Sequence, residues 1–384
     1  MAAENLRRVT IPSISAANHE FRWLVTGSEA FQAMLQHINS AQESLALECY
    51  ICKPGAVIDR FRIALIAACE RGVHVQLLLD AFGSDGLAGG YWREFERCGG
   101  QLRWFNPMRL LRLSFRNHRK LLVIDGMTAF AGGLNLADEY DGDGITRGWR
   151  DLAVELRGPL VDALAINFNQ MWALAAFEPS DLRRFAHAHA VPNLDTRQPK
   201  LLLAGPGCRT GRLRRQLFAD LRTARRVSLH AAYFLPSRKL GRLLAAVALR
   251  GEVRILMPGV SDVPVAKLAT YHAIRRINSE AIHYFEFIPQ MMHAKLMVID
   301  DVVYVGSANL DVRSRFINYE LMLRIPVRAL AEQALAIFDS DLHHSRRCQV
   351  PEASWWLRLR QHTAYWLLAR IDPYIASRKL RMLQ

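Results

Sequence analysis

The sequence reads NHRKLLVID over residues 117–125 and MHAKLMVID over residues 292–300. Both stretches follow one pattern, His-x-Lys-x4-Asp, in which four apolar residues separate a polar pair from an aspartate. Because residues two apart on a β-strand face the same side, the histidine and lysine of each pair project together. The apolar run predicts a strand that enters the core, with the aspartate at its end. We therefore expect two copies of one strand, each presenting an imidazole and an ammonium at its start.

Each copy continues into a second apolar strand that ends in small residues and an asparagine, Gly132-Gly133-Leu-Asn135 and Gly306-Ser307-Ala-Asn309. Small residues allow a ligand to approach the backbone, and an asparagine amide can donate to an oxygen. Six residues separate Asp125 from Gly132, but only five separate Asp300 from Gly306. A hairpin shorter by one residue would shift register and face, which bears on where Ser307 and Asn309 lie.

The flanking segments repeat as well. The distance between matching features is 183 residues for Tyr50 and Tyr233, 179 for Gly72 and Gly251, and 175 for the two motif histidines. Each glycine follows a basic residue and predicts a helix C-cap. Strands alternate with helical patterns, which predicts an α/β fold with a mostly parallel sheet covered by helices. A proline-containing polar stretch between the halves is typical of a linker. The expected domains are residues 1–177, a linker at 178–200, residues 201–345, and a C-terminal tail at 346–384.

The composition indicates what kind of partner the protein binds and in which cellular compartment it lies. The chain has 384 residues and a formal net charge of +14, which favours a polyanion such as nucleic acid or an anionic lipid surface. Six cysteines lack the dense spacing of a secreted scaffold, and the pair Cys49 and Cys52 lies in a strand-like stretch, so we expect buried, reduced thiols. No run approaches the length needed to span a bilayer, and residues 1–10 lack the apolar core of a signal peptide.

The paired motifs resemble the two HKD motifs of the phospholipase D superfamily, and the similarity extends over essentially the whole chain. Within that superfamily the chain is most similar to short bacterial cardiolipin synthases. The shared features are Trp149-Arg150-Asp151, residues 123–135, residues 306–311 and the aromatic-basic tail that starts at Trp355-Trp356. The resemblance implies two pseudo-symmetric α-β-α sandwich domains with mixed sheets. It also implies that both His-Lys pairs meet in one cleft, with no metal and no cofactor.

Phosphodiester exchange suits these side chains. Lys120 and Lys295, with Asn135, Asn309 and Ser307, would hold the phosphate oxygens and stabilise the charge of the transition state. One imidazole attacks phosphorus to form a phosphohistidine, and the other protonates the leaving alcohol and then deprotonates the incoming one. The resemblance implies that His118 is the nucleophile and His293 the general acid and base. The residues themselves do not distinguish these roles.

Four acids accompany the motifs. The resemblance implies that Asp151 and Glu320 orient the two histidines by accepting a hydrogen bond from the second ring nitrogen. On the sequence alone, a salt bridge at a strand end explains these two acids equally well. Asp125 and Asp300 complete the catalytic motifs, but each follows four apolar residues, so structural pairing near a turn is expected rather than direct chemistry.

Two regions favour a lipid substrate over nucleic acid. Residues 108–120 mix basic and large apolar side chains, as do residues 355–384 with their Trp and Tyr residues, and such mixtures suit a membrane interface. An amphipathic segment or helix packed on the protein body is the alternative for both. We therefore expect a cardiolipin synthase that transfers a phosphatidyl group between two phosphatidylglycerols, bound peripherally at the cytoplasmic face of the bacterial inner membrane. Its partners would be phosphatidylglycerol and cardiolipin, not nucleic acid, and the oligomeric state stays open. The alternatives are a phospholipase D hydrolase, a transferase with another alcohol acceptor, a nuclease of the same superfamily, and a non-catalytic lipid-binding scaffold.

Overall fold

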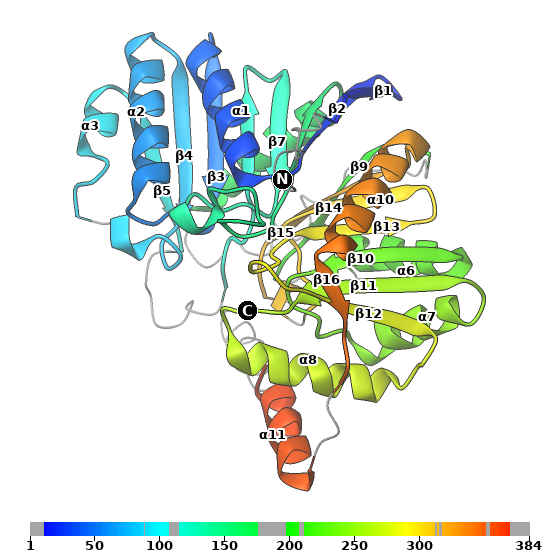
Figure 1. The fold of residues 1–384 in the computed structure, drawn as a ribbon. Helices are drawn as coiled ribbons and strands as arrows, with labels where there is room; N and C mark the ends of the chain where they lie inside the picture. The colour runs from blue at the N-terminus through cyan, green and yellow to red at the C-terminus, as the bar shows by residue number, and fades with distance from the viewer. Residues whose placement is uncertain are drawn as a thin grey trace, which may run out of the picture.

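The computed structural model describes residues 11–87, 89–106, 115–175, 197–206, 211–311, 313–314, 317–350 and 354–368. Two α/β units lie side by side, the N-terminal one in blue to cyan and the C-terminal one in green to orange (Figure 1). Each unit is built on an eight-stranded sheet. The expected division into two similar α/β units is therefore confirmed.

The first sheet has the strand order β1-β2-β8-β7-β6-β3-β4-β5. The helices α1 (Gly27–Ser40), α2 (Ala56–Glu70) and α3 (Arg93–Arg97) accompany it, and α4 (Leu160–Ala175) contacts five of its strands. The first turn of α1 is fixed by Thr26, whose hydroxyl accepts a hydrogen bond from the Glu29 amide. The strands are β1 (Ile14–Ala16), β2 (His19–Leu24), β3 (Ser44–Cys49), β4 (His74–Asp80), β5 (Gln101–Phe105), β6 (Leu121–Ile124), β7 (Thr128–Gly132) and β8 (Ala153–Arg157).

The second sheet has the order β16-β12-β11-β10-β13-β14-β15-β9. Its helices are α6 (Arg212–Thr223), α7 (Arg238–Ala248), α8 (Pro264–Ile277) and α10 (Arg328–His343). A last helix, α11 (Trp355–Trp366), packs on α8. The strands are β9 (Lys200–Ala204), β10 (Arg226–Ala231), β11 (Glu252–Pro258), β12 (Ile282–Phe287), β13 (Lys295–Ile299), β14 (Val302–Gly306), β15 (Glu320–Ile325) and β16 (Ser345–Arg347).

Both sheets are mixed, but the expectation that parallel pairing dominates is wrong. In each sheet only the ladders joined by helical crossovers are parallel, namely β3·β4 and β4·β5 at one end of the first sheet and β10·β11 and β11·β12 towards one end of the second. The motif strands instead belong to tight hairpins, which force antiparallel pairing. Strands that alternate with helices account for only part of each sheet.

The shorter second hairpin keeps the register of the first. Leu121 pairs with Ala131 and Leu296 pairs with Val305, so Gly132 and Gly306 occupy equivalent positions. The missing residue is absorbed by the turn, which has three residues after Ile124 and two after Ile299. Consequently Ser307 corresponds to Gly133 and Asn309 to Asn135, and the expected change of face does not occur.

Other features of the repeat differ from expectation. The ladders place Leu45 opposite Ile124 and Val227 opposite Ile299, which makes Tyr233 the equivalent of Ile51 rather than of Tyr50. Gly72 has the positive φ of a helix C-cap, 88°. Gly251 does not, and a side chain there would instead collide with the Arg225 carbonyl oxygen, 1.9 Å away.

The two units share one core. The apolar clusters beneath α1 and α2 and beneath α6 and α7 each belong to one unit. The third and largest cluster unites α4, α10 and the facing strands of both sheets, with Val123 and Ala129 from one half and Val298 and Val303 from the other. Burying these faces against each other fixes how the two halves sit.

The ends of the expected domains are only partly covered. Of the expected linker, residues 178–196 lie outside the described residues, and β9 begins at Lys200. The expected tail starts inside β16, which pairs with β12, so its first residues belong to the second sheet. None of the helices in the described ranges is long and apolar enough to cross a membrane. Cys49, Cys52, Cys69, Cys98 and Cys348 are free thiols, and the first three of these are buried as expected.

Candidate active site

The two motifs meet because each motif strand begins against a segment of the opposite half. The His118 amide donates to the Tyr319 carbonyl at 3.0 Å, and the His293 amide donates to the Arg150 carbonyl at 2.8 Å. Both histidines are buried, with 8% and 5% of their surface exposed. Tyr319 directly precedes Glu320, and Arg150 directly precedes Asp151. Each histidine is therefore delivered to an acid from the other half of the chain.

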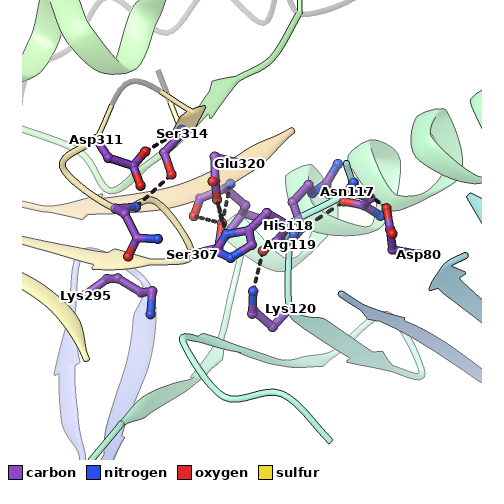
Figure 2. Close-up of polar contacts among 12 residues, drawn as sticks. Asp80, Asn117, His118, Arg119, Lys120, Lys295, Ser307, Asp311, Ser314 and Glu320 are labelled. Carbon is purple, nitrogen blue, oxygen red and sulfur yellow. Dashed lines mark hydrogen bonds and ion pairs between the residues drawn. The ribbon is translucent and has the colours of Figure 1, made fainter. Parts of the chain in front are cut away.

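His118 is held by Glu320. Its Nδ1 lies 3.0 Å from Glu320 Oε2, so the carboxylate accepts the Nδ1 hydrogen and leaves Nε2 with a lone pair. Ser307 donates to the same carboxylate oxygen at 2.5 Å and accepts from the Leu321 amide (Figure 2). Ser307 is almost completely buried, which makes it a positioning residue for Glu320. This geometry replaces the expectation that Ser307 binds the substrate phosphate.

His293 is held by Asp151 in the same way. Its Nδ1 lies 2.7 Å from Asp151 Oδ2. A side chain at Gly133 would come within 2.4 Å of the Asp151 carboxylate, so only glycine leaves room for this acid. Burial alone would raise the pKa of Asp151, yet the hydrogen bond from His293 and the charge of Lys295 keep it below the ordinary value. The orienting role expected for Asp151 and Glu320 thus matches the geometry, but across the two halves.

The two lysines are buried near the histidines, Lys120 directly before β6 and Lys295 at the start of β13. Lys120 Nζ donates to the His118 carbonyl at 2.6 Å, and Lys295 Nζ lies 2.8 Å from the His293 ring Nδ1. Burial lowers the pKa of Lys120 to about 8 and that of Lys295 to about 7. Two desolvated ammonium groups in one site attract an anionic group strongly, because little water screens them.

Both imidazoles are neutral in the free site. Burial lowers the pKa of His118 to about 4, although Glu320 opposes the shift. Burial, followed by the charge of Lys295, lowers the pKa of His293 to about 3. A neutral imidazole has the lone pair that a nucleophile or base requires. An anionic phosphate placed between them would raise both values, which suits a histidine that must next carry a proton.

The two asparagines differ in their partners. Asn135 Oδ1 accepts from the Ile51 amide at 3.2 Å, and its Nδ2 donates to the Tyr140 hydroxyl at 2.7 Å. Tyr140 in turn lies 3.5 Å from His293 Nε2, so Asn135 reaches the second histidine through a tyrosine. The Asn309 amide N–H donates to Ser314 Oγ, while its buried side-chain Oδ1 has no protein partner in the described part of the chain. Phosphate binding by these asparagines stays a prediction.

The motif aspartates lie away from the histidines. Asp125 and Asp300 sit in the hairpin turns, at the opposite end of the motif strand from the lysine, with φ of 52° and 49°. Asp125 accepts the backbone amides of residues 42–44, and Asp300 accepts those of Arg225 and Arg226. Each carboxylate therefore secures the start of the neighbouring strand. The structure supports the expected structural role and does not bring either residue into the site.

A buried polar network under His118 was not anticipated from the sequence. Arg119 lies 3.1 Å from Glu48, Asn117 donates to Glu48 at 2.5 Å, and the Asn117 amide donates to Asp80 at 2.9 Å. Arg116 contributes a further ion pair to Asp80. Asn117, Arg119 and Arg116 flank the motif histidine in sequence, but only the fold brings Glu48 and Asp80 to them.

The second half uses a different network. Arg150 Nε donates to Asp341 Oδ1 at 2.8 Å, and His230 Nε2 lies 3.0 Å from Asp341 Oδ2. All three residues are buried. No residue near His293 in the sequence points to this arrangement, because Asp341 lies in α10.

The proposed lipid-facing segment before the first motif is also corrected in part. Residues 107–114 lie outside the described residues. Phe115, Arg116 and Arg119 are buried, and the two arginines serve the ion pairs beneath His118. These three residues therefore do not form an exposed membrane surface.

Comparison with known proteins identifies relatives of this architecture. A family described as the phospholipase D-like domain of cardiolipin synthase matches residues 34–172 and 217–342. The major cardiolipin synthase ClsA of Bacillus subtilis is 30% identical over 359 residues, which cover 88% of this chain and 72% of the relative. A cardiolipin synthase of a Geobacillus strain is 32% identical and is matched over 84% of this chain and 66% of its own length. This chain thus spans about two thirds of the length of its curated relatives.

Solved structures share the fold at low sequence identity. A phosphatidylserine synthase of Haemophilus influenzae superimposes with a TM-score of 0.72 at 14% identity, covering 95% of this chain and 96% of that protein. A polyphosphate kinase of Porphyromonas gingivalis gives a TM-score of 0.56 at 13% identity, covering 94% of this chain and 55% of the kinase. The doubled α/β architecture with a shared core is therefore found in other proteins.

Proposed function

The chain belongs to the cardiolipin synthases of the phospholipase D superfamily, and from that premise we propose the reaction of its site. One phosphatidylglycerol donates its phosphatidyl group to a second, producing cardiolipin and free glycerol. The observation that carries the proposal is the crosswise holding of two neutral histidines, His118 by Glu320 and His293 by Asp151. Two histidines whose Nδ1 atoms are each held by an acid, together with two buried lysines, are the groups that a two-step phosphoryl exchange requires.

In the first step His118 Nε2 attacks phosphorus, and the bond from phosphorus to the glycerol headgroup oxygen breaks. The departing oxygen takes a proton from His293, which gains that proton from solvent when the bound anionic phosphate raises its pKa, and the phosphatidyl group remains on His118. In the second step the headgroup hydroxyl of another phosphatidylglycerol gives its proton to His293 and attacks phosphorus. The nitrogen–phosphorus bond breaks and frees His118. Lys120 and Lys295 neutralise the phosphate oxygens in both steps.

Water or another alcohol could replace the second lipid, and a nucleic acid could replace the first. The test supplies the protein with phosphatidylglycerol in mixed micelles with EDTA present. Equal amounts of cardiolipin and glycerol are expected. Phosphatidic acid alone would show a hydrolase, and DNA cleavage without lipid turnover would show a nuclease; either result contradicts the proposal.

The C-terminal helix supports peripheral binding to an anionic membrane. One face of α11 packs on α8 through Gln361, Ala364 and Tyr365. The opposite arc is apolar and exposed, since at 3.6 residues per turn the following side chains align on it: Trp355, Trp356, Leu359, Trp366 and Leu367. Arg358 and Arg360 flank this arc. Such a face suits the headgroup layer of a bilayer rich in anionic lipid. The expected tail is thus both packed on the body and exposed, and residues 369–384 lie outside the described residues.

Replacing Trp355 and Trp366 together by serine should weaken binding to phosphatidylglycerol vesicles about tenfold, because two large apolar groups leave the interface. Cosedimentation with vesicles measures the loss. The control replaces Ile63 and Ile166, which are also exposed but lie on α2 and α4. If both double variants bind the vesicles equally well, α11 does not contact the membrane. The free cysteines and the +14 charge favour the cytoplasmic face as the site of binding.

A further inference from the structure

A pocket lies beside Asn309 in the second half of the molecule. It is bounded by α6, by the start of α7 and by the segment after β14, and it encloses about 660 Å³ including its open mouth. The pocket adjoins the candidate active site, because Asp311 lines it and lies close enough to Glu320 for the two carboxyl groups to interact.

The first half carries larger side chains at the corresponding place. The matched hairpin registers make Ala308 the equivalent of Leu134, and counting onward along the chain pairs Ser314 with Tyr140. Leu134 and Tyr140 are buried in the core beneath α1 and α2. Replacing them by a methyl group and a hydroxymethyl group removes most of two side chains from the second half. The pocket is therefore larger than its counterpart in the first half, which is lined by Leu134 and Lys120 and encloses about 320 Å³ including its mouth.

Most of the pocket wall is apolar. Polar side chains line it in the segment after β14, and Arg214 on α6 and Ser237 at the start of α7 add two more. The apolar lining comes from α6, α7 and the loop after β14: Leu213, Leu217, Phe218, Leu240 and Leu310. Asn309, Asp311 and Ser314 are the polar residues of the segment after β14. Asn309 Oδ1 is buried and has no protein partner among the described residues, so it can accept from a bound ligand. An elongated apolar group attached to a polar head fits this distribution.

We propose that this pocket takes one acyl chain of the phosphatidyl donor. The inference rests on the proposed transferase function, which places the donor phosphate between the two histidines. Leu235 connects the pocket to the C-terminal helix. Its amide donates to the carbonyl of Leu310, which lines the pocket, and its side chain packs against α8 and α11. The pocket thus lies next to the segment that carries the exposed apolar face of α11.

The test fills the pocket with Ala308→Leu, a side chain that the first half accommodates at Leu134. Glycerol labelled in the headgroup of a long-chain phosphatidylglycerol is released only when that lipid is the donor. With excess dihexanoyl phosphatidylglycerol as acceptor, release from the long-chain donor should fall about tenfold relative to release from labelled dihexanoyl donor. Withholding roughly two methylenes from an apolar site produces that factor. Leu213→Trp, at the rim, should act in the same direction.

Ala219→Leu is the matched control, since Ala219 lies on the exposed side of α6 and does not line the pocket. An unchanged ratio of long-chain to dihexanoyl donor in both pocket variants overturns the proposal. A loss that appears only when the long-chain lipid is the acceptor also overturns it. Failure of the wild-type protein to release glycerol from either donor would instead refute the transferase function itself, so the two failures are distinguishable.

Discussion

The two halves of the molecule hold their histidines by the same principle with different side chains. His118 is fixed by a glutamate that a serine supports, and His293 by an aspartate that lies directly on a glycine. Glu320 is the first residue of β15. Asp151 lies at the equivalent position of the other half, two residues before β8 begins. Glu320, the longer acid, has the side chain of Ser307 beside it. Asp151, the shorter acid, has Gly133 beside it, which has no side chain. Duplication therefore preserved the geometry at the imidazole while the residues behind it changed.

The buried polar networks behind the two histidines differ more than the acids do. Beneath His118 lie Glu48, Asn117 and Arg119, whereas Arg150, Asp341 and His230 support the second half. Neither half is complete alone, because each supplies the acid that the other histidine needs. The comparison teaches that the functional unit is the pair of halves, and that the two histidines occupy different surroundings suited to different roles.

The largest effect is expected from removing either histidine. His118→Ala and His293→Ala should each lower kcat about ten thousandfold, because neither half can complete the exchange alone. His74→Ala, an exposed residue at the start of β4, serves as the control and should be unaffected. Cardiolipin formation measures the loss. Substantial turnover by either single variant would show that the halves act independently.

The second-largest effect is expected from replacing Asp151 and Glu320, the acids that hold the histidine of the opposite half. Asp151→Asn and Glu320→Gln should each lower kcat about a hundred- to ten thousandfold, since an amide stabilises the wrong imidazole tautomer. Nitrogen NMR should show a changed tautomer at His293 in the first variant and at His118 in the second. Asp162→Asn, an exposed acid in α4, is the control. A tautomer change at the histidine of the same half would contradict the crosswise arrangement.

The serine that supports only one half offers a sharper comparison. Ser307→Ala removes a hydrogen bond to a buried carboxylate and should lower kcat about tenfold. The pKa of His118 should shift in this variant while that of His293 does not, as measured by proton NMR titration. Equal shifts at both histidines would mean that Ser307 supports the whole site.

The smallest effect is expected from pH. Both lysine pKa values are lowered by burial, so the charged forms exist at low pH and are lost as pH rises through about 7 for Lys295 and about 8 for Lys120. On a short-chain soluble substrate, kcat/KM should therefore fall several-fold between pH 7 and pH 8, with Lys295 losing its charge first. A profile that stays flat to pH 10 would contradict the buried, depressed lysines.

The sequence alone predicts those features of the site that depend on residues close together in the chain. The spacing of His118 and Lys120 predicts that they share a face, and the apolar run behind them predicts the buried strand β6. The similar spacing at His293 predicts the second copy. Asp151 and Glu320 were named on resemblance, but the exchange between halves follows only from the shared core, which the sequence pattern does not encode.

Other features needed the fold because they depend on distant contacts. Arg116 and Arg119 look like surface charges in a basic stretch, yet Asp80 and Glu48 draw them into the interior. The shorter second hairpin suggested a shifted face, but a tighter turn absorbed the missing residue. Helices between strands suggested parallel sheets, whereas the hairpins that carry the motifs made most ladders antiparallel. In each case a tertiary contact or a turn decided the outcome.

The most direct test of the account is the number of phosphatidyl groups that one chain can carry. Rapid mixing with labelled phosphatidylglycerol, a denaturing quench at neutral pH and peptide mass spectrometry measure both the glycerol burst and the modified residue. A single site shared by both halves predicts a burst that approaches one glycerol per chain, with the label on His118 alone. A burst that approaches two, with label on both His118 and His293, would show two independent sites and contradict the account.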